Sequence, residues 1–154
     1  LAFYVIWPKI ENHLFKFNSV MERKECTKEK MQLRFGAYER LILLIHRISP
    51  AQVMLRNHQA NLSVLEFRQQ LIADIANEFQ HNFTQQLYVS DVAWVLIKDL
   101  KESTESLFRN ASLGLSDATP IDDYVAIVLN HLSGLDVNPY EAAQIILKKE
   151  LSAQ

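Results

Sequence analysis

The sequence predicts an all-α protein in which a long N-terminal helix leads into a helical bundle, with about five helices in total. Apolar residues recur at spacings of three and four along most of the chain, which is the period of an amphipathic helix. Residues that start and stop helices interrupt this pattern at regular places. The 154 residues are 49% hydrophobic with only 3 Gly and 4 Pro, so the chain has enough apolar side chains for a buried core.

The first helix is predicted over residues 9–49. Its second half carries an apolar stripe made of Tyr38, Leu41, Ile42, Ile45 and Ile48. Residues 22–30 are almost entirely polar, so this part is expected to cross solvent as a rod rather than to form a coiled coil. Ser49-Pro50 is predicted to end the helix, because a residue before proline disfavours the α conformation. Residues 50–62 are then expected to form a connection.

Two further long helices carry clear start signals. Ser63 followed by Glu66 is typical of a capping box, and Ser90 before Asp91 favours a second N-cap. The apolar stripe predicted for the second helix consists of Phe67, Leu71, Ile72, Ile75, Phe79, Phe83 and Leu87. The stripe predicted for the third helix consists of Ala93, Leu96, Ile97, Leu100, Leu107, Phe108 and Ala111. Gly114 is suited to the stop that follows.

Two short helices complete the prediction. Thr119-Pro120 and Asn138-Pro139 each place a capping residue before a proline, and proline is favoured at the first helical position. Gly134 is expected to close the first of these two helices. The predicted architecture is therefore three long helices closed by a pair of short ones.

The N-terminal region suggests a membrane anchor. Leu1–Trp7 is uncharged, and residues 1–49 hold nine Lys and Arg against five acids, whereas residues 50–154 hold seven against thirteen. Basic residues after an apolar span are typical of its cytoplasmic flank. We expect residues 1–8 to end a truncated transmembrane helix, 9–35 to form a charged juxtamembrane rod, and 36–154 to form a cytoplasmic helical domain. The residues expected near the membrane are Tyr4, Trp7, Lys9, Lys16, Arg23 and Lys24.

Several strings within residues 31–110 resemble an uncharacterised bacterial family. They include Tyr38-Glu39-Arg40-Leu41, Arg47-Ile48-Ser49-Pro50, Glu78-Phe79-Gln80-His81-Asn82 and Gln85-Gln86-Leu87-Tyr88-Val89-Ser90, continuing to Trp94. Members of that family resemble short proteins with one N-terminal transmembrane helix and a cytoplasmic helical domain. The resemblance implies a single-span protein of the bacterial inner membrane. It implies no activity, cofactor or catalytic residue.

The candidate protein interface is a polar stripe on the second helix with two aromatic residues beyond it. It comprises Glu78, His81, Asn82, Gln85 and Gln86, followed by Tyr88 and Trp94. Amides and imidazole both donate and accept hydrogen bonds, and Tyr and Trp are enriched among the residues that dominate binding energy. The alternatives are a solvated face for the stripe and core positions for the two aromatic residues.

The sequence gives less support to a metal site and to an anion site. Glu78-x-x-His81 is one half of a helical-bundle metal site, but such a site needs the motif twice, so no metal or other cofactor is expected. Arg40, Arg47 and Arg56 suit either a partner's anionic group or ion pairs with acids such as Asp74 and Glu78.

Catalytic and nucleotide-binding motifs are not found in the sequence. It contains no Gly-x-Ser-x-Gly string and no glycine-rich phosphate loop. Acids interrupt its basic stretch, which argues against a nucleic-acid partner. The sequence favours a non-enzymatic membrane-anchored scaffold or accessory subunit that works through protein contacts, with no small-molecule substrate. The first alternative is a soluble homo-oligomeric bundle with Leu1–Trp7 as a contact; a metal protein built on Glu78 and His81 is a distant one.

Overall fold

The structure, a computed structural model, describes residues 27–152 of the chain. The chain divides into two compact units, Leu1–Gly36 and Ala37–Gln154. Residues 27–48 are helical and are called the first helix below. In the first unit, the apolar side chains of Met31, Leu33 and Phe35 are exposed.

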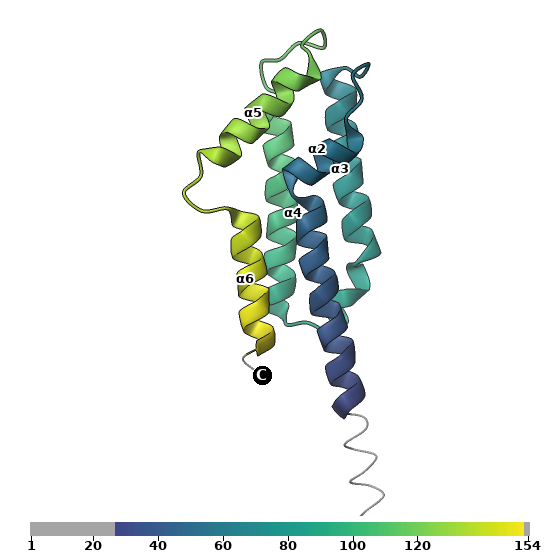
Figure 1. Ribbon diagram of the computed structural model, residues 1–154. Helices are drawn as coiled ribbons and strands as arrows, with labels where there is room; N and C mark the ends of the chain where they lie inside the picture. The colour runs from purple at the N-terminus through teal and green to yellow at the C-terminus, as the bar shows by residue number, and fades with distance from the viewer. Residues whose placement is uncertain (1–26, 153–154) are drawn as a thin grey trace, which may run out of the picture. The chain divides into compact units, whose positions relative to one another are not determined.

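The second unit is a helical bundle (Figure 1). After the first helix come α2 (Pro50–Asn57), α3 (Val64–His81), the short 3₁₀ helix η1 (Phe83–Leu87), α4 (Asp91–Ala111), α5 (Ile121–Ser133) and α6 (Pro139–Ser152). The residues described contain no strand. The predicted all-α class and the bundle of about five helices are confirmed.

The core lies where the first helix, α3 and α4 face one another, and α5 and α6 close it. Fully buried large side chains from these elements include Tyr38, Leu41, Leu44, Ile45, Ile48, Phe67, Leu71, Ile75, Ile97, Phe108, Tyr124 and Leu147. The ring of Phe67 meets that of Tyr124 edge to face, with 5.9 Å between centroids, so α3 contacts α5 directly. The first helix, α3 and α4 thus bury most of the apolar residues that recur at the helical period in their sequences.

The prediction that residues 50–62 form a connection is wrong for Pro50–Asn57, because these residues form helix α2. Pro50 does end the first helix, yet it also occupies the first position of α2, where its missing N–H leaves no donor unpaired. The Ser49 hydroxyl donates to the carbonyl of His46 at 2.7 Å and holds the bend between the two helices. One proline therefore stops one helix and starts the next.

Most helix starts follow their sequence signals. Ser63 and Glu66 form the reciprocal capping box, the Ser90 side chain accepts from the Ala93 amide, and Asn138 accepts from the Tyr140 amide.

The predicted cap at Thr119 is wrong. The Thr119 hydroxyl accepts a hydrogen bond from the Ser116 amide at 3.2 Å within the preceding turn and does not cap α5. The residue just before the first residue of α5 is Pro120.

The predicted second-helix stripe ends earlier than expected. α3 stops at His81 and the chain continues as η1, whose three residues per turn change the direction of successive side chains. Phe83 and Leu87 are consequently 49% and 73% exposed instead of joining the core.

Buried hydroxyl groups link helices that are distant in sequence. The Tyr38 hydroxyl donates to Glu150 on α6 at 2.8 Å and accepts from the Ser90 amide at 3.5 Å. The Tyr124 hydroxyl donates to the carbonyl of Phe108 at 2.8 Å, which fastens α5 to α4. These bonds set the positions of the two closing helices, because a buried polar group without a partner would be costly.

The bond between Thr104 and Tyr140 fastens α6 to α4 and gives the first testable prediction. The two hydroxyl oxygens are 2.6 Å apart, and burial raises the pKa of Tyr140 to about 12. Replacing Tyr140→Phe removes this buried bond and should lower the free energy of unfolding by about 1 kcal/mol.

The measurement is urea denaturation at neutral pH. The midpoint should fall with an unchanged slope, which reports the surface exposed on unfolding. Tyr88→Phe is the matched control, because Tyr88 is 39% exposed and should change stability by less than about 0.5 kcal/mol. Equal effects of the two substitutions would contradict the assigned role of the bond.

Candidate functional site

Glu78, the first residue of the predicted polar stripe, is held in an ion pair. Arg47 on the first helix donates to both of its carboxylate oxygens, one of them through Nε at 2.7 Å. The Glu78 side chain is 12% exposed. The hydrogen bonds from Arg47 hold the pKa of Glu78 below its usual value. Glu78 therefore joins the first helix to α3.

A second ion pair continues this contact. Arg56 on α2 donates to Asp74 on α3 at 3.0 Å and also to the backbone carbonyl of Arg47 at 2.9 Å. The Asn57 amide donates to the same Asp74 oxygen at 2.6 Å. The alternative in which Arg47 and Arg56 pair with Glu78 and Asp74 is thus confirmed. Arg40 lies exposed on the first helix.

The remaining polar residues of the stripe separate into different environments. His81 is exposed at the end of α3, and the Asn82 side chain donates back to the carbonyl of Glu78 at 2.9 Å. Gln85 is 8% exposed, while Gln86 is half-buried. The stripe is not one continuous polar surface, because η1 turns its second half away from the direction of α3.

The two aromatic residues of the predicted interface, Tyr88 and Trp94, also lie in different environments. Trp94 is buried in an aromatic cluster, where its ring lies 5.2 Å from Phe79 and 6.0 Å from Phe83 between centroids. The Lys101 ammonium lies 5.5 Å from the Phe79 ring centre and covers one side of the cluster. Tyr88, by contrast, is exposed. Trp94 takes the core position that was the alternative for it.

Around Tyr88 the structure reveals an apolar surface that the predicted stripe only partly included. We call it the α3–α4 tip; its residues are Phe83, Leu87, Tyr88, Val92 and Val95, each between 39% and 73% exposed. Residues 82–97 contain a single charged side chain, Asp91. That near-absence of charge was the sequence signal for this surface, since exposed helix ends are ordinarily rich in charged residues.

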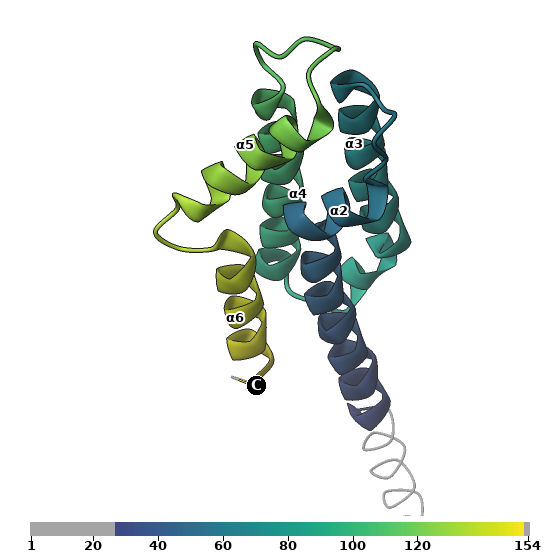
Figure 2. The ribbon, with the colours of Figure 1, turned by 45° about the horizontal axis from the view of Figure 1, so that its top comes forward.

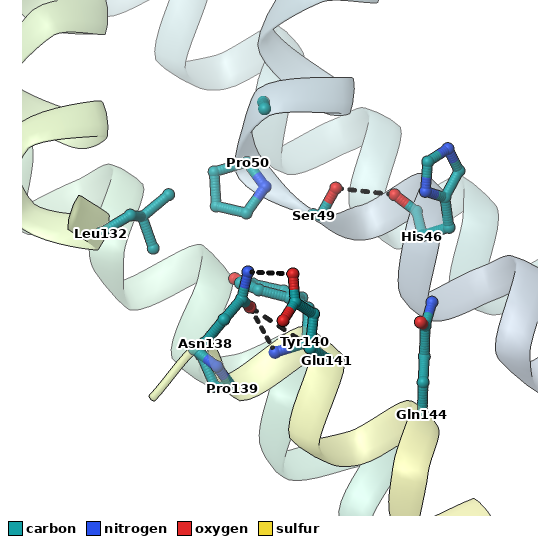
Figure 3. Close-up of a pocket in the computed structure, with 10 residues that line it drawn as sticks. His46, Ser49, Pro50, Leu132, Asn138, Pro139, Tyr140, Glu141 and Gln144 are labelled. Atoms are coloured by element: carbon teal, nitrogen blue, oxygen red, sulfur yellow. Dashed lines mark hydrogen bonds between the residues drawn. The ribbon is translucent and has the colours of Figure 1, made fainter. Parts of the chain in front are cut away.

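A pocket of about 290 Å³ lies elsewhere in the second unit, between the α2 start and the α6 start (Figure 3). The polar residues that line it are His46, Ser49, Asn138, Tyr140, Glu141 and Gln144. Ser49 is bonded to the His46 carbonyl, and Asn138 caps α6. Figure 3 shows that His46 and Glu141 do not point toward one another.

Residues 27–152 carry neither a clustered set of metal ligands nor a bilayer-spanning helix. In that range no group of three or more His, Cys, Asp or Glu side chains comes together as a metal site. No helix in the described part of the chain combines the length and the apolar character needed to cross a bilayer. The six residues predicted near the membrane, from Tyr4 to Lys24, lie outside the described residues.

A family model matches the chain over residues 1–154. The chain belongs to a family of unknown function (DUF7935). No curated protein and no solved structure matches it. Because the family brings no activity with it, the function of this member has to be inferred from its own surfaces.

The Arg47–Glu78 pair gives a second prediction, on pH dependence. Since the pKa of Glu78 is lowered in the folded protein, the pair stabilises the fold above the ordinary value of 4.5 and loses this effect as the pH falls through the folded pKa. Glu78→Gln should therefore lower the free energy of unfolding by about 1 to 2 kcal/mol at pH 7. This difference in the free energy of unfolding between the wild type and Glu78→Gln should become smaller as the pH falls toward 3.5.

Chemical denaturation at several pH values measures this difference. Glu102→Gln serves as the control, because Glu102 is exposed on α4 and should change stability little at any pH. A deficit for Glu78→Gln that stays the same from pH 7 to pH 3.5 would show that the carboxylate charge is not what stabilises the contact.

Proposed function

We propose that this protein is a non-enzymatic, membrane-anchored accessory subunit or scaffold that binds a partner protein through the α3–α4 tip. The observation that carries the proposal is the tip itself, five large apolar side chains exposed within residues 83–95. Exposed apolar side chains that lie close together in the chain, at the junction of two helices, are typical of an interaction site.

The tip rests on a rigid base, which favours binding. Phe83 packs edge to face against both Phe79 and Trp94, and η1 joins directly to the capped start of α4. A surface that is already ordered loses little conformational entropy when a partner binds. Tyr88, at the centre of the tip sequence, offers both an aromatic ring and a hydroxyl group for contact.

The tip lies close to the point where the chain enters the second unit. Tyr38, the second residue of this unit, accepts a hydrogen bond from the Ser90 amide next to the tip. The chain therefore enters the second unit beside the tip. An anchor before this point, as the sequence predicts, would be joined to the second unit through the helix that carries Tyr38.

The charge of the tip favours a protein over lipid head groups. Residues 82–97 contain Asp91 but no Lys or Arg. Binding to anionic membrane surfaces relies on clusters of basic residues. An uncharged apolar patch with Tyr at its centre instead resembles the core of a protein interface.

The third prediction tests this interface by co-purification. The protein is expressed from its own gene with a C-terminal tag, extracted from membranes in mild detergent, and isolated with its companions. We expect a stoichiometric membrane-protein partner with the wild type and at least a tenfold loss of it with Leu87→Ser/Val92→Ser. Each of these side chains is more than 70% exposed, so the fold should be preserved.

The matched control is Leu55→Ser/Leu113→Ser, which removes two side chains of similar exposure, 74% and 76%, far from the tip in sequence. It should retain the partner. Equal recovery with both double variants would reject the tip as the interface. Recovery of the protein alone as a defined oligomer would reject the accessory-subunit role in favour of self-assembly, and its appearance only in the soluble fraction would reject the anchor.

A further inference from the structure

A groove runs along α4 beyond the tip, beside the contacts that α5 and the start of α6 make with α4. It consists of two hollows of about 470 and 270 Å³ that share Ser103, Leu107 and His131. α4 forms the floor, Ile127 and His131 of α5 form one wall, and Leu135 and Pro139 close one end. Figure 2 shows α5 crossing α4 obliquely before the chain turns into α6. We call this feature the α4–α5 groove.

The floor of the groove has the residue spacing that accepts a helix. The α4 residues that line it are Leu96, Asp99, Leu100, Ser103, Ser106, Leu107, Asn110 and Ala111. They recur at intervals of three and four, which places them along one side of α4. Ser103, Ser106 and Ala111 are small, so a second backbone can approach closely. From Leu96 to Ala111 the floor is about 22 Å long at 1.5 Å per residue, enough for four turns of a partner helix.

The surroundings of the groove are acidic. Residues 110–147, which include α5 and the start of α6, contain five acids and no Lys or Arg. Asp99 lines the groove itself, and Asp123 lies one turn before Ile127 on the same side of α5. On the outer edge of α4, Arg109 is paired with Glu105, and Lys98 lies near the exposed Glu102. The lining thus contains an acid and no cation.

We propose that the α4–α5 groove binds a basic amphipathic helix of a partner protein. Apolar side chains of that helix at positions i, i+4 and i+7 would lie against Leu96, Leu107 and Ile127. Lys or Arg on its flanks would face Asp99, Asp123 and the acidic turn around Asp136. This is the helix-in-groove mode of recognition, in which the apolar stripe gives affinity and the flanking charges give orientation and specificity. The ligand differs from the uncharged partner surface proposed for the tip, and the proposal does not depend on that one.

The fourth prediction uses a designed peptide as the probe. A fluorescently labelled 14-residue helix of Leu and Lys, with Leu at i, i+4 and i+7 spacing, is titrated with the purified 154-residue protein. Fluorescence anisotropy should show a micromolar Kd that weakens at least fivefold between about 50 and 300 mM salt, because screening reduces charge attraction. A peptide with Glu in place of every Lys should bind at least tenfold more weakly, as should a Leu/Lys peptide with the order scrambled.

Variants of the protein locate the binding to the groove. Ser103→Phe fills the groove at the point that both hollows share and should weaken binding at least tenfold, whereas Ser133→Phe, on the far side of α5, should not. Asp99→Lys should weaken binding at least fivefold, whereas Glu39→Lys, with the same change of net charge on the first helix, should change it less than twofold. Circular dichroism and thermal unfolding confirm that each variant is folded.

Loss of binding in Ser103→Phe and in Asp99→Lys, together with retained binding in the controls Ser133→Phe and Glu39→Lys, supports the proposal. Equal binding of the Lys and Glu peptides would overturn the charge argument, and wild-type affinity in Ser103→Phe would overturn the location. No binding of the Leu/Lys peptide at 100 µM protein would also overturn it. If only Leu87→Ser/Val92→Ser weakens peptide binding, the site is the tip and the groove proposal is wrong.

Discussion

The need to cover the apolar side of α4 is the constraint on which the rest of the fold depends. α4 has 21 residues and is about 31 Å long, and its buried residues include Trp94, Ile97, Thr104 and Phe108. α3 covers one side along most of this length. The first helix, α5 and α6 complete the cover, and α5 and α6 have only 13 and 14 residues and are separated by a turn. These short helices leave a face of α4 exposed, and one strip of this face carries few charged residues.

Both candidate surfaces, the α3–α4 tip and the α4–α5 groove, include residues of that strip. Val92, Val95, Asp99, Ser103, Ser106 and Asn110 are all exposed and recur every three or four residues along one side of α4. Val92 and Val95 belong to the tip, and Ser103, Ser106 and Asn110 line the groove. A buried apolar side chain contributes about 1.5 to 3 kcal/mol when it leaves water completely. Covering the tip therefore yields enough free energy to offset much of the entropy lost on association.

The sequence predicted those features that depend on neighbouring residues. Ser63 with Glu66 forms a capping box within one turn, and Ser90 and Asn138 cap their helices through equally local bonds. Local chemistry determined each of these caps, so the sequence alone was sufficient to predict them. The pairs that Arg47 and Arg56 make with Glu78 and Asp74 join different helices, and the sequence offered them only as one of two alternatives.

Features that depend on tertiary packing were missed. Pro50 signals the end of one helix, but whether a new helix starts there depends on Arg56 and Asn57 reaching Asp74 on α3. The change from α3 to η1 shifts Phe83 and Leu87 out of the predicted stripe, and it buries Gln85 while exposing Tyr88. Of the seven residues predicted for the interface, only Tyr88 belongs to the tip as defined by exposure. The near-absence of charge over residues 82–97 would have been the better guide.

The chemistry of the uncovered strip changes along α4, and this order limits what can bind there. It begins with Val92 and Val95, passes the carboxylate of Asp99, and continues with the small polar side chains of Ser103 and Ser106. A charged helix laid along the whole strip would desolvate its own basic groups against the valines, where no acid other than Asp91 is close in sequence. A purely apolar surface would instead leave Asp99 buried without a partner. The tip and the groove therefore favour different ligands, an uncharged surface at one end of α4 and a basic helix farther along it.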